Sequence, residues 1–324
     1  MNLAFAGFRH AHIIGLYRSA AQNARVNILG CYESDRQARK CAEKEQGISF
    51  KYESYEDILS DNRVDAVAIG DYYSRRGKMV IEALKCGKHV ICDKPICTDI
   101  GELDEIERLS HEKGLNVCCM LDLRYMPQTE KVKKLVKEGA IGQVHIISFT
   151  GQHCLDYENR PGWYFEKGKH GGTLNDIAIH GIDLVRYITG KDLTEIDYAK
   201  TWNAFAYKTP DFKDCGQLAA RFDSVSVMAD VSYSAPKFSG TLPTYWDFKL
   251  WGSDGMISFN FAEPVIKVYK TLEITVECEQ TAIGYLDAFV DEINGKQTKM
   301  NTADILASQR QTLLIQKYAD ERND

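Results

Sequence analysis

Lys94 is the residue of this chain that is best placed to act on a ligand. It follows the short apolar run 90–92, which has the character of a buried strand, and it precedes Pro95. Open α/β sheets bind their ligands just beyond the carboxyl ends of their strands. Because Pro95 disfavours the helical conformation at the residue before it, we expect Lys94 to be extended. The alternative is an ordinary solvated lysine before a turn, since most lysines are exposed.

A second reactive group lies in the segment 170–184, which has a helical pattern from about residue 174. Asp176 and His180 stand four residues apart, so on an α-helix they share one face. A carboxylate can orient an imidazole and raise its basicity, and an imidazole titrates near neutral pH, so the pair predicts proton transfer. Two other interpretations stay open. One is a core histidine bonded to a helix neighbour, and the other is a metal site, which we do not favour because the pair supplies only two ligands.

The turn after the first expected strand, residues 7–12 with the sequence GFRHAH, is the third candidate. In dinucleotide-binding domains, such a turn and the start of the next helix direct backbone N–H groups at a pyrophosphate. Gly7 keeps the first position of the G-x-G-x-x-G pattern, whereas Arg9 and His12 occupy the other two glycine positions. By itself, this segment is more typical of a plain strand-to-helix turn than of a dinucleotide site.

Glu33 strengthens the dinucleotide interpretation, because it follows the second expected strand directly. A carboxylate at this place accepts hydrogen bonds from the ribose hydroxyls of adenosine and repels a 2′-phosphate, so it favours NAD over NADP. The other interpretation is that Glu33 and Asp35 only cap the next helix. The nearby Arg36 keeps NADP open as a cofactor.

Alternating strands and helices in the first 120 residues must position these groups. This order is typical of βαβ units around a parallel sheet, and runs such as 66–69 are apolar on both faces, as helices on both sides of a sheet require. We expect strands at 2–6, 26–32, 65–69, 88–92 and 116–120, and helices at 11–22, 35–45, 54–60, 74–86 and 99–114.

After about residue 122 the pattern changes to longer strands with turns between them, which predicts an α+β domain with a mainly antiparallel sheet. The expected domains are therefore residues 1–122 and 123–324. In the second domain we expect helices at 127–138, 174–188, 281–293 and 302–319, and strands at 144–150, 193–200, 217–223, 225–233, 245–251, 256–260 and 264–268.

The composition is that of an ordinary globular protein, with 44% hydrophobic and 27% charged residues among 324 and a net charge of −6. This balance does not favour nucleic acid or an anionic membrane as a partner. No apolar run approaches the ~18 residues of a membrane helix, and the N-terminus is typical of a first strand and not of a signal peptide. The ten cysteines show no Cys-x-x-Cys pair, so we expect reduced thiols in a cytoplasmic protein without a metal site.

Several segments, taken in order, resemble the Gfo/Idh/MocA oxidoreductases, and the resemblance covers essentially the whole chain. Residues 93–95 (DKP) resemble the Glu-Lys-Pro of that family, and residues 122–125 (DLRY) resemble its Asn-x-Arg-Phe. Residues 171–183 resemble its Gly-Gly…Asp-x-x-x-His-x-x-Asp helix, and residues 87–90 (GKHV) also agree. The departures are the degraded glycine turn, Asp93 for Glu, Asp122 for Asn, and Asp71-Tyr72-Tyr73 for the usual Thr-Pro-Asn.

The resemblance implies a Rossmann domain with a doubly wound parallel sheet, followed by an α+β domain whose large open sheet forms a homodimer or homotetramer. It makes Lys94, Asp176 and His180 the catalytic residues, with the choice of Lys94 or His180 as the immediate base left open. It further implies two sets of binding residues. The cofactor would be bound by Gly7, Phe8, Arg9, His10, His12, Glu33, Asp71, Tyr72, Arg76, Asp93, Lys94 and Asp122, and the substrate by Arg124, Tyr164, Asn175 and His180.

The expected function is hydride transfer between NAD, or NADP, and a secondary hydroxyl or ketone of a sugar, cyclitol or derivative. Two alternatives stay open. One is NAD-dependent cleavage of a glycosidic bond on the same fold, and the other is a noncatalytic regulator that senses a dinucleotide. The aromatic segment 160–165 suits either contact with a sugar face or packing in the core.

Overall fold

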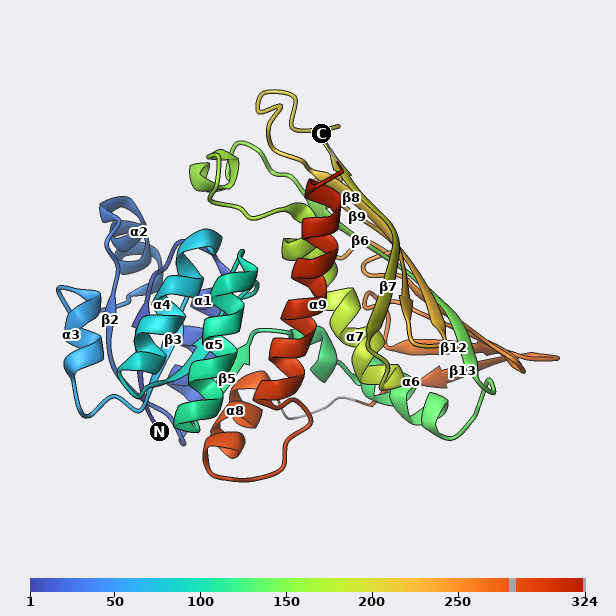
Figure 1. Ribbon diagram of the computed structural model, residues 1–324, viewed down its shortest axis with the longest axis horizontal. Coiled ribbons are helices and arrows are strands. Elements are labelled where there is room, and N and C mark those ends of the chain that lie inside the picture. Colours follow the sequence, from blue (N-terminus) through green and yellow to red (C-terminus); the bar gives the residue numbers. More distant parts are fainter. Residues whose placement is uncertain (280–283, 323–324) are drawn as a thin grey trace. The chain divides into compact units, whose positions relative to one another are not determined.

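The computed structural model describes residues 1–279 and 284–322. The chain forms two compact units, which we describe separately (Figure 1). Unit 1 comprises Met1–Met120, Pro161–Gly171 and Ile283–Ala307, and unit 2 comprises Leu121–Arg160, Gly172–Ala282 and Ser308–Asp324. The first break lies close to the expected boundary at 122, but two later segments, 161–171 and 283–307, pack with the first unit.

Unit 1 is built on a five-stranded parallel sheet in the order β2-β1-β3-β4-β5, which confirms the expected α/β architecture. Strands β3 and β4 are buried almost throughout, as a sheet covered on both faces requires. Helices α4 and α5 pack side by side (Figure 1). The elements are β1 (Asn2–Ala6), α1 (His12–Gln22), β2 (Asn27–Tyr32), α2 (Arg36–Gln46), α3 (Tyr55–Ser60), β3 (Ala66–Ile69), α4 (Tyr73–Lys85), β4 (His89–Cys92), α5 (Ile100–Lys113), β5 (Val117–Cys119), a 3₁₀ turn η2 (Gly162–Phe165) and α8 (Tyr285–Ile293).

Local capping residues explain where several of these helices begin. Asp35 accepts a hydrogen bond from the N–H of Ala38 at the start of α2, and Asp99 does the same for Glu102 in α5. Helices α2 and α5 both end at a glycine in the left-handed conformation. The expected helix at 281–293 is confirmed from Tyr285 onward, and its positions 281–283 lie outside the described residues.

Unit 2 is built on an eight-stranded sheet in the order β13-β12-β11-β10-β6-β9-β8-β7. All neighbouring strands run antiparallel except β6 and β9, so the expected mainly antiparallel sheet is confirmed. The elements are η1 (Asp122–Tyr125), α6 (Pro127–Lys137), β6 (Val144–Cys154), η3 (Leu174–Ala178), α7 (Ile179–Thr189), β7 (Leu193–Trp202), β8 (Cys215–Phe222), β9 (Val225–Ala235), β10 (Phe248–Gly252), β11 (Gly255–Phe259), β12 (Val265–Tyr269), β13 (Glu273–Glu277) and α9 (Thr302–Asp320), which begins in unit 1.

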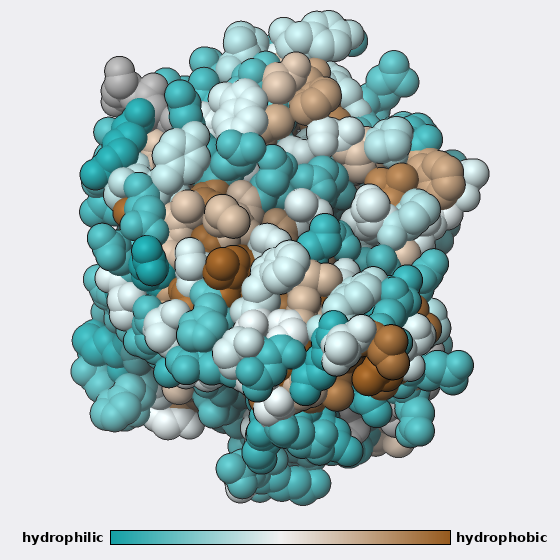
Figure 2. Space-filling model, turned by 90° about the vertical axis from the view of Figure 1, so that its right-hand side faces the viewer, coloured by the Kyte–Doolittle hydropathy of each residue, from teal (hydrophilic) through white to brown (hydrophobic). Residues whose placement is uncertain are grey.

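The two faces of this sheet differ. Helix α7 packs against β6, where Gly181 leaves room for the ring of Phe149, because a Cβ at this glycine would overlap that ring. The opposite face carries partly exposed apolar side chains, including Ile146, Met228 and Trp251. Figure 2, a view from the side of the eight-stranded sheet, shows hydrophobic side chains in small groups among hydrophilic ones. None of the helices in the described part of the chain is long and apolar enough to cross a membrane.

Candidate functional site

The turn between β1 and α1 packs against the backbone that follows β3. Gly7 has a φ of +86°, and a Cβ at this position would lie 2.6 Å from the backbone nitrogen of Asp71, so only glycine is tolerated. The N–H groups of Arg9 and His10 donate to the carbonyl of Gly70. Among the described residues, no acceptor is bonded to the N–H groups at position 11, the N-cap of α1, and at position 12, its first residue. These groups suit an anion at the start of the helix.

Glu33 holds this turn from the end of β2. Its carboxylate is buried and accepts hydrogen bonds from the N–H of Phe8 at 2.5 Å and from the N–H of Asp35 at 2.7 Å. Burial raises the pKa of Glu33, and these two N–H donors counter that rise. Each carboxylate oxygen has a second lone pair, which is able to accept a hydrogen bond from a ribose hydroxyl. Arg9 lies 3.5 Å from Asp35 at the same place.

Asp93, at the carboxyl end of β4, is the centre of a buried charged cluster. Its Oδ2 lies 2.9 Å from Nη2 of Arg76 and 2.5 Å from Nδ1 of His10, and its Oδ1 lies 3.2 Å from Nδ1 of His12. Burial by itself raises the pKa of Asp93, but the Arg76 guanidinium and the two imidazoles hold it well below its usual range. Asp93 is therefore ionised at neutral pH and is balanced by Arg76.

Arg76 also fixes the backbone around Lys94. Its Nη1 donates to the carbonyl of Lys94 at 2.6 Å and its Nε to the carbonyl of Asp71 at 2.7 Å, while its guanidinium lies over the ring of Tyr73. The fully buried Arg76 therefore braces the strand end, and its expected contact with the cofactor stays a prediction. Lys94 itself is only 2% exposed, and its bond to Pro95 is cis. It is not the solvated lysine of the alternative interpretation.

A hydrogen-bonded chain of rings extends this cluster. Nε2 of His10 lies 3.3 Å from the hydroxyl of Tyr73, which lies 2.8 Å from the hydroxyl of Tyr164. The Trp163 indole donates to the carbonyl of Arg9 at 3.0 Å. The aromatic segment 160–165 thus contributes buried rings to unit 1, and the expected substrate contact of Tyr164 stays a prediction.

His10, His12 and Asp93 form the one group of potential metal ligands within 4.8 Å of one another in the described residues. Arg76 already neutralises the Asp93 carboxylate, and His10 is bonded to it directly. A dication at this place would face the buried guanidinium at close range, so the geometry favours a proton-sharing network.

The stability of unit 1 is expected to fall as the pH drops from about 6.5 to about 4. Burial lowers the pKa of His10 from 6.5 to about 4, against the attraction of Asp93. Between these values the unfolded chain binds a proton that the folded chain does not, so acid favours unfolding, by on the order of 3 kcal/mol in total. Urea titrations of the wild-type protein and of His10→Asn across this window measure the effect.

The slope of stability against pH should flatten in His10→Asn. It should stay unchanged in His111→Asn, because His111 lies exposed at the end of α5. An equal slope in the wild-type protein and in His10→Asn would contradict the assignment of the lowered pKa to His10.

The other expected catalytic residues lie in unit 2 at the start of α7. The expected helix at 174–188 is confirmed, and its first segment, Leu174–Ala178, is π-helical before α7 begins at Ile179. Such a turn commonly marks a functional site. Asp176 is buried and accepts a hydrogen bond from the Tyr233 hydroxyl. Nδ1 of His180 lies 3.8 Å from the exposed carboxylate of Asp122, a residue that was expected to bind the cofactor.

Two expected substrate residues have partners within unit 2. Nε of Arg124 lies 3.0 Å from Asp183, and the Arg124 guanidinium lies over the ring of Tyr187. The amide oxygen of Asn175 accepts a hydrogen bond from Gln309 at 2.8 Å. Both side chains are buried and support α7, and their contact with a substrate stays a prediction.

The remaining expected cofactor residues, Asp71 and Tyr72, follow β3. The buried Asp71 carboxylate accepts a hydrogen bond from the N–H of Tyr72 and lies 3.2 Å from Nη1 of Arg75. The Tyr72 ring lies beneath the cationic groups of Arg9 and Lys169. The hydrogen bond of Trp163 to Arg9 and the ring contacts of His170 with Tyr73 and Tyr164 were missed, because an irregular segment far along the chain has no periodic pattern to assign it to the first sheet.

Two family models match the chain in succession. "Oxidoreductase family, NAD-binding Rossmann fold" matches residues 5–121, and "GFO/IDH/MocA C-terminal domain" matches residues 129–258. The first match coincides with the parallel sheet of unit 1, which is therefore an NAD-binding Rossmann domain. The Gly7 turn and the start of α1 are consistent with this cofactor.

Relatives and solved structures agree with these matches. The chain is 29% identical to the uncharacterized oxidoreductase YrbE of Bacillus subtilis over 53% of its own length and 48% of that protein. It is 27% identical to a myo-inositol 2-dehydrogenase of Thermotoga maritima over 57% and 56% of the two chains. The chain thus spans about half the length of the curated relatives that it matches.

A structure of levoglucosan dehydrogenase in complex with NADH and levoglucosan superposes on the chain with a TM-score of 0.81 at 21% identity, covering 99% of this chain and 96% of the other. This likeness shows the fold. Together with the two successive family matches, it confirms the resemblance seen in the sequence, and the chain belongs to the Gfo/Idh/MocA family of oxidoreductases.

Proposed function

We propose that this protein transfers a hydride between NAD and a secondary hydroxyl or ketone of a sugar, cyclitol or related polyol. One observation carries the proposal: a buried lysine, Lys94, stands at the carboxyl end of β4 in an NAD-binding Rossmann domain. Relatives named for such substrates, a myo-inositol 2-dehydrogenase and a levoglucosan dehydrogenase, support the substrate class.

The residues that would hold the cofactor lie in unit 1. The Gly7 turn and the N–H groups at the start of α1 suit the diphosphate, and Glu33 suits the adenosine ribose. NAD, when bound, supplies the hydride acceptor or donor. Because Glu33 is an anion at the ribose position, NAD is expected to bind more tightly than NADP.

The proposal assigns the proton chemistry to three residues. His180 accepts the proton of the substrate hydroxyl, and Lys94 polarises the hydroxyl oxygen and relays the proton. Asp176 positions the start of α7, where its carboxylate accepts the Tyr233 hydroxyl. The Asp122 carboxylate lies 3.8 Å from Nδ1 of His180, so it stands beside the imidazolium that forms when His180 accepts a proton.

A screen of sugars and cyclitols tests this function. The purified protein is mixed with each compound and either NAD or NADP, and the absorbance of the reduced nicotinamide is followed. The proposal expects turnover with at least one polyol, and a higher kcat/KM for NAD than for NADP. If no polyol gives a reduced nicotinamide while NAD still binds, the protein is a dinucleotide-sensing regulator and the proposal is wrong.

We further propose that the open face of the unit 2 sheet joins copies of the chain into a homodimer or homotetramer. Ile146 and Trp251 are paired neighbours on β6 and β10, and both are about half exposed on the same face as Met228. Apolar groups of this size are typical of a contact surface. Sedimentation of Trp251→Lys should show a smaller particle than the wild-type protein, and an unchanged particle would refute the contact.

All ten cysteines are free thiols. This suits a reducing compartment, and we propose a cytoplasmic location. Recovery of the protein from the periplasmic or secreted fraction of its cells would contradict it.

A further inference from the structure

Arg75 and Arg76 are neighbours on α4, but their side chains have different surroundings. Arg76 is fully buried, and its guanidinium is bonded to Asp93 and to backbone carbonyls. The Arg75 side chain is 36% exposed. Arg75 was not among the expected site residues, because the sequence does not distinguish two successive arginines in the first turn of a helix. The structure therefore leaves Arg75 as the arginine of the pair that is accessible to a ligand.

The Arg75 guanidinium joins the ends of two strands of unit 1. Its Nη1 donates to the hydroxyl of Ser34, which lies just after β2, at 3.0 Å. The same nitrogen lies 3.2 Å from the carboxylate of Asp71, which lies just after β3. In the sheet, β1 lies between these strands, and the Gly7 turn follows it. Open α/β sheets bind their ligands where the strand order changes direction, as it does here between β1 and β3, so Arg75 stands at the expected cofactor crevice.

Half of this guanidinium has no partner in the described part of the chain. Both contacts of Arg75 use Nη1, whereas Nη2 and Nε, which carry three N–H groups, form no hydrogen bond with another described residue. These two nitrogens form one edge of the guanidinium. Such an edge binds two oxygens of a phosphate or carboxylate at once, so Arg75 is suited to an oxyanion.

The end of β2 combines a group that repels a phosphate with one that attracts it. An acid at this place repels a 2′-phosphate on the adenosine ribose, and an arginine nearby accommodates one. Glu33 is the acid, and both of its oxygens accept backbone N–H groups. Ser34 follows Glu33 directly and brings Arg75 to the same strand end. The other charges there are Arg9 and Asp35, which lie 3.5 Å apart and balance each other.

We infer that Arg75 binds the 2′-phosphate of NADP at the end of β2, beside the Ser34 hydroxyl, so that the protein accepts NADP as a second and weaker cofactor than NAD. The inference rests on the proposed position of the adenosine ribose at Glu33, but not on the hydride transfer reaction. Glu33 keeps NAD the tighter ligand, and Arg75 limits the difference between the two affinities.

Titrations of NADH and NADPH, followed by nicotinamide fluorescence without any substrate, test the inference. Arg75→Leu should weaken the binding of NADPH by about 10- to 100-fold, the usual cost of losing a hydrogen bond to a charged group. It should leave the affinity for NADH almost unchanged. Calorimetry with adenosine 2′,5′-bisphosphate and with 5′-AMP repeats the comparison for the adenosine half alone, and only the bisphosphate should bind more weakly to the variant.

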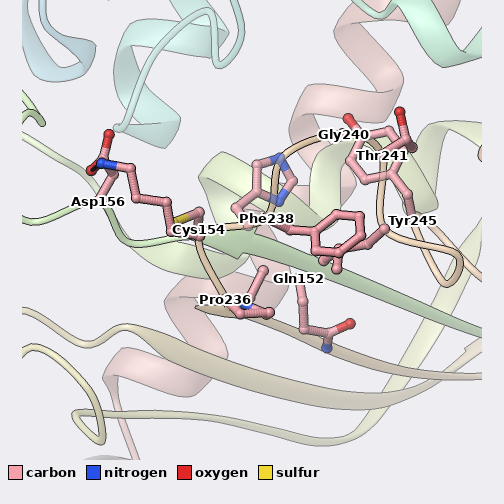
Figure 3. A pocket seen from close by; sticks show the side chains of 12 residues that line it. Gln152, Cys154, Asp156, Pro236, Phe238, Gly240, Thr241 and Tyr245 are labelled. Atoms are coloured by element: carbon pink, nitrogen blue, oxygen red, sulfur yellow. Dashed lines mark hydrogen bonds and ion pairs between the residues drawn. The ribbon is translucent and has the colours of Figure 1, made fainter.

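Lys237 provides the matched control, because it is another exposed cation beside a carboxylate. It lines a pocket of about 510 Å³ in unit 2, at the ends of β6 and β9. Its Nζ lies 3.2 Å from the carboxylate of Asp156, which Figure 3 shows at one side of that pocket. The volume is within the ~300–1,000 Å³ typical of small-molecule sites, so Lys237→Met tests whether the extra phosphate is held there instead. This variant should bind NADH and NADPH as the wild-type protein does.

Asp71 requires a second comparison. Arg75→Leu leaves this buried carboxylate without its cation, which is a cost for the fold and for any anionic ligand. Asp71→Asn and the double variant Asp71→Asn/Arg75→Leu both lack the carboxylate. NADPH should bind more weakly to the double variant than to Asp71→Asn, and NADH should bind equally to the two.

The outcomes separate this site from the proposed function. A loss of affinity that is confined to NADPH and to the Arg75 variants supports the site, even if no polyol is turned over and the dehydrogenase proposal is wrong. Turnover of a polyol with NAD, together with NADPH binding that is absent or does not depend on Arg75, overturns the site and leaves the dehydrogenase intact. An equal loss of NADH and NADPH affinity in both comparisons also overturns it.

Discussion

Replacing Lys94 by methionine is expected to lower kcat by about 10²- to 10⁴-fold, the usual range for loss of a group that takes part in proton transfer. Methionine keeps the length and apolar stem of the side chain but removes its charge and its protons. Because Lys94 is buried at the end of β4, no solvated side chain nearby can replace it in proton transfer. The measurement is steady-state turnover of the best polyol with NAD, together with NAD affinity.

Lys88 provides the matched control, because it is a second buried lysine beside the same strand, at the opposite end from Lys94. Its Nζ donates to the carbonyls of Asp61 at 2.8 Å and Val64 at 2.9 Å, so its role is structural. Lys88→Met should lower the melting temperature and leave kcat near the wild-type value. Near-normal turnover in Lys94→Met would rule out its catalytic role.

Replacing Arg76 by leucine is expected to destabilise unit 1 by about 3–5 kcal/mol, since removing one partner of a buried ion pair leaves the other charge without compensation. Both Arg76 and Asp93 are 0% exposed, so water cannot solvate the carboxylate that remains. The loss should appear in urea unfolding and as a fall in melting temperature of about 10 °C.

Arg108→Leu is the control for this change. Arg108 pairs with Glu105 and Glu112 on the exposed side of α5, where solvent screens the charges, so no measurable loss of stability is expected. If Arg76→Leu unfolds at the same urea concentration as the wild-type protein, the Asp93 cluster does not brace the strand end.

Most of the parallel sheet could be predicted from the sequence, because each of its strands is a short apolar run between helical patterns. Strand β13 was not predicted, although Ile274 and Val276 alternate with polar residues along Glu273–Glu277, because the run is short and exposed along almost its whole length. It forms by pairing with β12, and such an edge strand depends on its neighbour more than on its own sequence.

The candidate site was predictable to the extent that its residues stand at strand ends or on a regular helix. The sequence places Lys94 and Glu33 correctly at the ends of β4 and β2. It does not reveal that Asp93 binds Arg76 and both histidines of the turn, since these contacts join positions up to 83 residues apart. The π-helical form of Leu174–Ala178, which includes Asp176, could not be predicted either, because the spacing of apolar residues does not distinguish a π-helix from an α-helix.

If Glu33 binds the adenosine ribose as proposed, its double role limits how the cofactor preference of this protein can be changed. In many dinucleotide enzymes, the acid at this position can be exchanged to admit a second phosphate. Here both oxygens of the same carboxylate also hold the backbone, at Phe8 and at Asp35. A substitution that removes the repulsion of a phosphate therefore also releases the turn that positions the rest of the cofactor. A change of preference, in evolution or by engineering, requires a second substitution that restores these two hydrogen bonds.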